Sequence, residues 1–353
     1  MSTKDLDAAG ITDPPLRVAY ERSRQLHSSH GKTYYLATLL LPRAKRPFVW
    51  ALYGFARYAD EFVDSLTEPD PSGLVRWGDD FLDRLRLDPL APAGVDPRHD
   101  PVGAAMEDTM RRWGIPRAHV EAFLESMRMD ITEATYRTYT DLEHYMYGSA
   151  AVIGLQMLPI LEPSTPEAAP RARALGEAFQ MSNFIRDVGE DLTRGRVYLP
   201  QEDLELFGVT ATDLAAGEVT APIRRLLQFE IDRTRALYAY AEPGIDMLHP
   251  TSRDCMRTAF ELYGGILAAV ERADYQVLRR RVTVSLPRRL AVAGPGLVRA
   301  HAARRRPERH EQPVEEREER DDAPDDGARA EDGRTPGGDE EQAVRTPAPA
   351  RDA

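Results

Sequence analysis

The chain contains the segment Asn183-Phe184-Ile185-Arg186-Asp187-Val188-Gly189-Glu190-Asp191-Leu192-Thr193-Arg194-Gly195-Arg196-Val197-Tyr198-Leu199-Pro200, which predicts a helix with a strongly charged face. At about 100° per residue, one face of this helix and of the turn before it is polar, and consists of Gln180, Asn183, Asp187, Asp191 and Arg194. The opposite face is apolar and consists of Met181, Ile185, Val188 and Leu192. Gly195 and Pro200 end the helix, as such residues commonly do. A single stripe of this kind is usually a solvated surface, so it does not identify a site alone.

A second segment, Ala51 to Asp64, carries a similar polar stripe on an otherwise apolar helix, and its members are Tyr53, Arg57, Asp60 and Asp64. Each segment therefore places two aspartates four residues apart on one helix face. Carboxylate oxygens suit hard divalent cations such as Mg²⁺. A bound Mg²⁺ retains several water ligands, and substrate phosphates complete its coordination shell. We predict that Mg²⁺, or Mn²⁺ in its place, is held by Asp60, Asp64, Asp187 and Asp191.

Both segments resemble the aspartate-rich motifs of the squalene/phytoene synthase family. Asp60-Glu61-Phe62-Val63-Asp64 is similar to the first motif, and Asp187-Val188-Gly189-Glu190-Asp191 to the second. The second match continues through Arg194-Gly195-Arg196-Val197-Tyr198-Leu199-Pro200, and there the chain looks most like the bacterial phytoene synthases. The resemblance covers Pro15 to Ala300 and no part of the C-terminal tail.

The resemblance implies an all-α fold, an isoprenoid-synthase-type helical bundle around one central cavity. It implies a Mg²⁺-dependent prenyltransferase that joins two C20 geranylgeranyl diphosphates head to head. The reaction would pass through a cyclopropyl (prephytoene) diphosphate and give phytoene and diphosphate, in carotenoid biosynthesis. No NADPH is expected for this activity.

Two alternatives stay open. A C30 enzyme using farnesyl diphosphate, which makes squalene, presqualene diphosphate or dehydrosqualene, shares the same motifs. The chain lacks a Gly-rich dinucleotide turn, but this is weak evidence against NADPH because family members bind NADPH without one. A lipid- or protein-binding helical scaffold without activity would keep the apolar pocket, but it has no reason to keep both aspartate pairs and the arginines.

The resemblance also implies roles for individual residues. Arg57 joins the four aspartates as a catalytic candidate, because arginine contacts diphosphate oxygens in a bidentate manner. Substrate and diphosphate contacts are implied for His30, Lys32, Thr33, Tyr53, Tyr145, Gln180, Asn183, Arg186, Arg194, Arg196, Tyr263 and Arg281. For Arg186 a structural salt bridge is an equal alternative. For Tyr263 the equal alternative is an aromatic residue of the core, and for Arg281 it is a charged residue of the surface. Gly31 stands where the family often has serine, which removes one hydroxyl donor.

Substrate length would be set by a pocket that includes Tyr34, Thr38 and Gly154. If Tyr34 marks the diphosphate end, Thr38 lies one helical turn deeper on the same face. A large aromatic side chain at that depth would close the pocket, whereas threonine leaves room for a C20 tail. This chain departs from the family pattern around Gly154 at Met146, Ser149 and Ala151, so the pattern does not determine the shape of the pocket.

Helices are predicted over most of the chain, and Thr140 is the expected N-cap of one of them. The predicted ranges are 16–30, 43–64, 74–87, 102–113, 116–130, 142–161, 171–194, 201–207, 222–242, 255–276 and 286–303. We divide the chain into a flexible N-terminus (1–14), a synthase domain (15–303) and a disordered charged tail (304–353). The tail is expected to be disordered because it has almost no large apolar residue.

Composition and charge limit the partners. Of the net charge of −12 among 353 residues, the stretch from Arg305 to Ala353 contributes −7, with 16 acidic and 9 basic residues. This acidic balance argues against a nucleic-acid partner. One cysteine, Cys255, excludes an internal disulfide and is expected to be a small buried hydrophobe.

The sequence also bears on location. The N-terminus has no signal-peptide pattern. The 17-residue uncharged run from Tyr145 to Leu161 is interrupted by glycine and glutamine, so it predicts a buried helix. We expect a cytoplasmic protein whose apolar product favours peripheral contact with the inner face of the membrane. The oligomeric state is left open.

Overall fold

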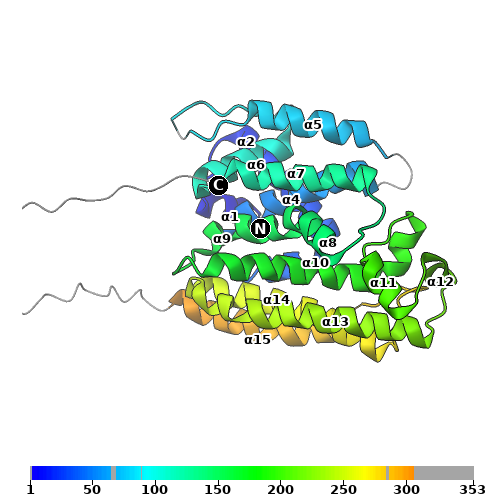
Figure 1. Ribbon diagram of the computed structural model, residues 1–353. Coiled ribbons are helices and arrows are strands. Elements are labelled where there is room, and N and C mark those ends of the chain that lie inside the picture. Colours follow the sequence, from blue (N-terminus) through cyan, green and yellow to red (C-terminus); the bar gives the residue numbers. More distant parts are fainter. Residues whose placement is uncertain (1, 65–68, 89, 284–285, 306–353) are drawn as a thin grey trace, which may run out of the picture. The chain divides into compact units, whose positions relative to one another are not determined.

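The computed structural model describes residues 2–64, 69–88, 90–283 and 286–305 (Figure 1). The chain divides into two units, Met1–Pro307 and Glu308–Ala353. The second unit lies outside the described residues, and so does the predicted disorder of the tail beyond residue 305.

The described residues form α-helices connected by turns, and they contain two isolated β-bridges but no strand. This confirms the all-α prediction. The N-terminal helices are α1 (Ser2–Ala8), α2 (Pro14–His30), α3 (Lys32–Thr38), α4 (Arg46–Asp64), α5 (Pro71–Arg84), α6 (Pro101–Trp113), α7 (Arg117–Thr132), α8 (Tyr139–Met146), the π-helix η1 (Tyr147–Ala151) and α9 (Val152–Leu161). The C-terminal ones are α10 (Ala168–Thr193), α11 (Gln201–Phe207), α12 (Ala211–Ala215), α13 (Ala221–Ala241), the 3₁₀-helix η2 (Glu242–Met247), α14 (Pro250–Arg272) and α15 (Leu286–Arg305).

The long helix α10, which carries the second aspartate segment, has neighbours on opposite sides. It packs against η1 and α9 on one side and against α13 and α14 on the other (Figure 1). The predicted apolar face is buried, with Met181, Ile185 and Val188 at most 5% exposed. Gly195 follows the helix with φ of +74°, a left-handed conformation that favours glycine. The predicted amphipathic helix and its end are therefore confirmed.

The N-terminal segment, which the sequence analysis predicted to be flexible, contains a helix and buried residues. Ser2–Ala8 is helix α1, and the side chains of Leu6 and Ile11 are 4% and 0% exposed. The Arg17 guanidinium donates to the Ile11 carbonyl at 2.7 Å and pairs with Asp7 at 2.8 Å. Two apolar anchors and this arginine are enough to hold a segment whose composition alone looks polar.

The predicted helix over 142–161 is divided into α8, η1 and α9. Its N-cap is Thr138 rather than Thr140: the Thr138 hydroxyl accepts from the Asp141 amide at 3.1 Å, and Asp141 accepts from the Thr138 amide at 2.9 Å. This reciprocal pair satisfies two amides that would otherwise lack partners. The N-cap therefore lies two residues before the predicted one, and α8 begins at Tyr139 instead of Leu142.

Glycines allow α10 to lie very close to η1 and α9. A Cβ atom built on Gly154 would lie 2.3 Å from the Ala172 carbonyl oxygen, and one on Gly176 would lie 2.4 Å from the Ala150 carbonyl oxygen. Both clashes are with backbone, which cannot rotate away. Gly154, predicted as a residue of the substrate pocket, therefore also sets the distance between two helices.

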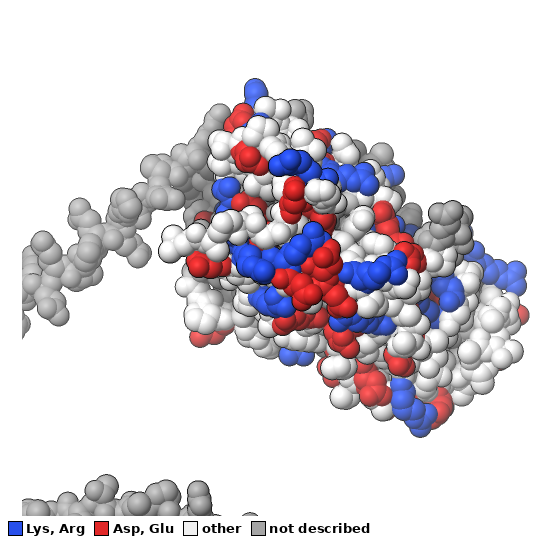
Figure 2. All heavy atoms as spheres, turned by 90° about the horizontal axis from the view of Figure 1, so that it is seen from above, with Lys and Arg blue, Asp and Glu red and all other residues white. Residues whose placement is uncertain are grey.

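The surface carries charges of both signs. Figure 2 shows acidic and basic side chains interspersed on the face seen from above, without a continuous basic area among the residues coloured there. None of the described helices is long and apolar enough to cross a bilayer.

We predict that Gly154→Ala lowers the free energy of unfolding by about 1–3 kcal/mol, because the new methyl group must push two helices apart. Gly264→Ala is the matched control, since a Cβ atom there meets only the Tyr238 ring at 3.8 Å. The control should be neutral or stabilising because alanine favours helix over glycine. Urea unfolding followed by circular dichroism measures both variants, and equal midpoints would contradict the proposed close contact.

Candidate active site

A cavity of about 610 Å³ lies among α3, α4, α10, α14 and the α8–α9 segment. One part of its wall is charged, and the rest is lined mainly by aromatic and aliphatic side chains. It is a central cavity of the kind that the resemblance implied. The two aspartate segments face it from α4 and α10, which are far apart in sequence.

The charged wall contains three of the four predicted metal ligands, Asp60, Asp187 and Asp191. Asp64 is the last residue of α4, and its side chain lies outside the described residues. Glu190, which the sequence analysis did not single out, also lines the wall. Two helices thus bring at least four carboxylates to one region, and this density of negative charge requires compensation.

Arginines supply that compensation. Arg186 donates to both Asp187 oxygens at 2.7 and 2.5 Å, and Arg281 lies 2.9 and 3.0 Å from the same two oxygens. The Asp187 side chain is 14% exposed, so it is a mostly buried carboxylate between two guanidinium groups. Arg186 thus forms the salt bridge that was one of its two predicted roles, and it also lines the cavity. Its contact with substrate stays a prediction.

The other predicted arginines lie along the same wall. Arg194 contacts Glu190 at 3.1 Å and Asp191 at 3.8 Å. Arg196 donates to the backbone carbonyl of Asp130 at 2.9 Å. Across the cavity, Glu61 is a shared partner: its Oε1 lies 3.5 Å from Nε of Arg57 and 3.7 Å from Nε2 of His30. The charged wall is thus an alternating array of arginines and carboxylates.

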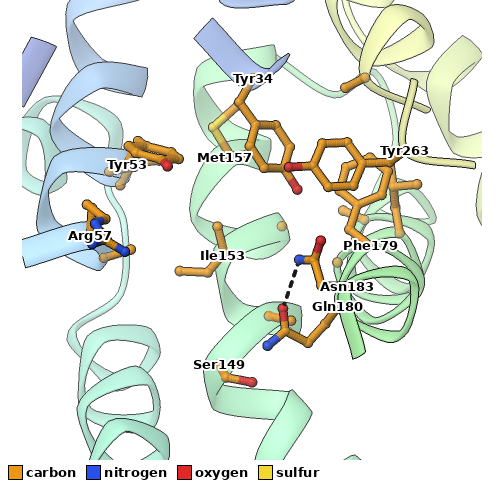
Figure 3. Close-up of a pocket in the computed structure, with 18 of the residues that line it drawn as sticks. Tyr34, Tyr53, Arg57, Ser149, Ile153, Met157, Phe179, Gln180, Asn183 and Tyr263 are labelled. Atoms are coloured by element: carbon orange, nitrogen blue, oxygen red, sulfur yellow. Dashed lines mark hydrogen bonds between the residues drawn. The ribbon is translucent and has the colours of Figure 1, made fainter. Parts of the chain in front are cut away.

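Aromatic rings line the part of the cavity next to the charged wall. Tyr34 stacks on Tyr263 with ring centres 4.3 Å apart, and Phe179 lies 4.7 Å from Tyr263. Figure 3 shows this group opposite Tyr53 and Arg57, with Ser149, Ile153 and Met157 along one helix between them. Burial raises the pKa of the Tyr34 and Tyr263 hydroxyls, so both stay protonated and neutral at ordinary pH.

Gln180 and Asn183 complete the polar side of α10. The Asn183 amide nitrogen donates to the Gln180 side-chain oxygen at 3.4 Å, and both residues point into the cavity (Figure 3). The far part of the cavity is apolar and includes Thr38, whose hydroxyl donates to the Tyr34 carbonyl at 2.9 Å. Cys255, 3% exposed, also lies on this wall, as expected for a small buried hydrophobe.

Asp130, at the end of a predicted helix, was missed by the sequence analysis. Its carboxylate accepts hydrogen bonds from the hydroxyls of Tyr145 at 2.8 Å and Tyr198 at 3.0 Å, and it lines the cavity. This contact raises the pKa of Tyr145 beyond the effect of its burial. Asp130 has no second aspartate four residues away, so helical spacing gave no signal for it.

His27 was also missed. Its ring stacks on Tyr53 at 4.2 Å, and in the described structure neither ring nitrogen has a hydrogen-bond partner. Burial lowers the pKa of His27 to about 3, so the imidazole is neutral. A neutral His27 adds no charge to the charged wall, and its stacking supports the position of the Tyr53 ring.

Two predicted substrate residues are not brought to the cavity. Lys32 is exposed and Thr33 is partly buried, and neither lines the wall. Gly31, by contrast, has a clear role: a Cβ atom there would lie 2.5 Å from Cζ of Tyr53. A serine at this position would displace the Tyr53 ring. Every other predicted site residue with a described side chain lines the cavity.

The family model described as squalene/phytoene synthase matches residues 27–288. A phytoene synthase of Arthrospira platensis is 35% identical over 75% of this chain and 88% of its own. The 15-cis-phytoene synthase of Synechococcus elongatus is 36% identical, over 81% and 94%.

Among solved structures, a dehydrosqualene synthase in complex with a ligand aligns with a TM-score of 0.72 at 27% identity, covering 81% of this chain and 98% of its own. A squalene synthase from Alicyclobacillus acidocaldarius aligns with a TM-score of 0.67 at 29% identity, over 76% and 98%. The match of the family model spans most of the helical unit and both aspartate segments. On this evidence the chain belongs to the squalene/phytoene synthase family.

Proposed function

We propose that this protein is a phytoene synthase, a prenyltransferase that condenses two C20 geranylgeranyl diphosphates head to head and releases diphosphate. The observation that carries the proposal is the meeting of Asp60, Asp187 and Asp191 with four or more arginines at one end of an otherwise apolar cavity. Such a cavity suits a substrate with a highly charged head and a long hydrocarbon tail. The scaffold alternative explains the apolar part but not the charged wall.

The choice of C20 over C15 is supported by the relatives. Those with the names phytoene synthase or 15-cis-phytoene synthase share about a third of their residues with this chain over most of its length. The solved structures of a dehydrosqualene synthase and a squalene synthase, both names of C30 enzymes, have lower sequence identity to this chain, 27% and 29%. Thr38, small and 2% exposed on the cavity wall, agrees with a pocket left open for the longer tail.

The donor set fits a divalent cation of the Mg²⁺ type. Asp60, Asp187 and Asp191 offer only carboxylate oxygens, the ligands that Mg²⁺ prefers. Among the described residues no three metal-binding side chains form a ready cluster, and Asp187 is paired with two arginines. We infer that these carboxylates hold Mg²⁺ together with substrate phosphates, and the contribution of Asp64 stays a prediction. Bound Mg²⁺ would neutralise charge that builds up on the departing diphosphate.

The arginines act on the same group. Arg186 and Arg281, which contact Asp187, and Arg57 on the opposite wall present fixed N–H donors toward the charged end of the cavity. Donors fixed in advance stabilise a developing anion without reorganising during the reaction. We infer that these side chains bind the diphosphate as the allylic carbon–oxygen bond breaks.

The rest of the cavity protects the cation left behind. Water would trap an allylic cation as an alcohol, so the site must be closed to it. Tyr34, Phe179 and Tyr263 present ring faces there, and ring faces attract cations. Neutral, buried tyrosines also avoid placing a strong base beside the cation.

We predict that the purified protein with Mg²⁺ converts geranylgeranyl diphosphate to phytoene without NADPH. Separate incubations with C15 and C20 diphosphates, with and without NADPH, followed by identification of the hydrocarbons, test this. Chelation of the metal with EDTA should abolish product. Conversion of the C15 substrate alone would contradict the assignment.

Asp187→Asn should lower turnover about 100-fold or more, because it removes a negative charge at the centre of the charged wall while keeping side-chain volume. Asp232→Asn, at an exposed carboxylate paired loosely with Arg235 at 3.6 Å, is the matched control and should keep normal turnover. Steady-state rates are measured at limiting Mg²⁺, with melting temperatures to confirm folding. Near-normal activity of Asp187→Asn would show that the wall is not the reaction centre.

Thr38→Phe should shift preference from C20 toward C15, since overfilling a packed site costs about 1–3 kcal/mol. Thr38→Val is the control: it keeps the volume and loses only the hydrogen bond to the Tyr34 carbonyl. Competition between the two substrates measures the preference directly. If Thr38→Phe accepts C20 as well as the parent does, Thr38 does not limit the tail pocket.

A further inference from the structure

The helix α10 faces the cavity along most of its length. Side chains at every fourth position of this helix line the cavity, and they are Arg171, Leu175, Phe179, Asn183, Asp187 and Asp191. At about 1.5 Å per residue, the distance from Arg171 to Asp187 along the helix is about 24 Å. Arg171 therefore lies at the end of the cavity away from the charged wall, with Leu175 and Phe179 between the two ends.

The cavity wall around Arg171 is apolar. Gly244 of η2 lies directly against Arg171, because a Cβ atom built on this glycine would lie 2.4 Å from the Cβ atom of Arg171. The residues next to this contact, Ala241, Ile245 and Leu248, line the cavity and are at most 5% exposed. A guanidinium group on such a wall needs polar contacts, since removing its charge from water is otherwise costly.

Tyr240 supplies two contacts that hold the Arg171 guanidinium. Nη1 of Arg171 donates to the Tyr240 carbonyl oxygen at 2.5 Å, and Cζ lies 3.9 Å from the centre of the Tyr240 ring. The face of an aromatic ring attracts a cation placed over it. Because Tyr240 is 47% exposed while Arg171 lines the cavity, the two side chains separate this end of the cavity from the surface.

The length of the cavity matches the length of a C20 tail. An extended geranylgeranyl chain, with carbon–carbon bonds of about 1.5 Å, is about 20 Å long. With its diphosphate at Asp187, such a tail would place its last five-carbon unit beside Arg171, about 24 Å away along α10. A C25 tail would have to displace the Arg171 guanidinium and break its contacts with Tyr240.

We propose that Arg171 is a specificity-determining residue, which closes the tail end of the cavity and rejects prenyl diphosphates longer than C20. Its side chain occupies the space that a fifth isoprene unit needs, and overfilling a packed site is unfavourable. Gly244 leaves the room in which Arg171 takes this position. The inference rests on the proposed function, because it takes the diphosphate to be bound at the charged wall.

Competition between C20 geranylgeranyl diphosphate and C25 geranylfarnesyl diphosphate, with the full chain and Mg²⁺, tests this inference. The parent should strongly prefer C20. Arg171→Ala should raise kcat/KM for C25 relative to C20 by at least about tenfold, because it removes the end wall. Arg171→Lys should largely restore the preference of the parent, since it keeps a long cationic side chain at the same place.

Arg257→Ala is the matched control. Like Arg171, Arg257 contacts η2, where it pairs with Asp246 at 2.8 Å, but within the described part of the chain it lies outside the lining of the cavity. This variant should keep the ratio of the parent. Tyr240→Leu leaves α10 unchanged and should raise the ratio about threefold, because Arg171 loses the ring face. Melting temperatures show whether each variant folds, and if Arg171→Ala does not, the ratio in Tyr240→Leu decides.

Three results would overturn the inference: conversion of C25 by the parent as readily as C20, continued rejection of C25 by Arg171→Ala, or an equal rise of the ratio in Arg257→Ala. In each of them the parent still converts C20, so the proposed function stands. A parent that does not convert C20 would instead contradict the proposed function, and the inference with it.

Discussion

The charged wall of the cavity depends on the balance of charge around Asp187. Its carboxylate lies between Arg186 of its own helix and Arg281 of a segment nearly a hundred residues later. Taking these charges partly out of water is costly unless each is paired. A close approach of the two segments makes the pairing possible: a Cβ atom on Gly189 would lie 2.1 Å from the Leu278 carbonyl oxygen, so only glycine admits the segment that carries Arg281. Fold and charged wall are thus linked at one glycine.

The cavity can meet two opposite chemical needs, the binding of a charged head and of an apolar tail, because its charged and apolar parts are separate. The charged wall offers carboxylates and guanidinium groups in fixed positions, which suits a diphosphate and its metal ions. A few side chains away, Tyr34 and Tyr263 stack at 4.3 Å and begin an apolar region without strong bases. The helices that hold this boundary are kept close by Gly154 and Gly176, so their packing and the shape of the cavity are not independent.

Much of this could be predicted from the sequence, because helical spacing shows directly which side chains share a face. The polar stripes that include Asp60 and Asp187 were found in this way, and both line the cavity. Contacts between distant segments gave no such signal. Asp130 was missed because its role comes from the hydroxyls of Tyr145 and Tyr198, which periodicity does not bring together. The N-terminal helix was predicted to be flexible because its polar composition hides two apolar anchors, Leu6 and Ile11.

The central claim is that the charged wall and the metal together bind the head of a C20 diphosphate, while the apolar cavity takes its tail. The most direct test is calorimetric titration with geranylgeranyl thiolodiphosphate, in which sulfur replaces the bridging oxygen and slows ionisation. We predict saturable binding that requires Mg²⁺ and is weakened by at least about tenfold, or 1.4 kcal/mol, when Arg281 is replaced by glutamine. Equally tight binding without Mg²⁺, or binding that ignores the Arg281→Gln change, would contradict the account.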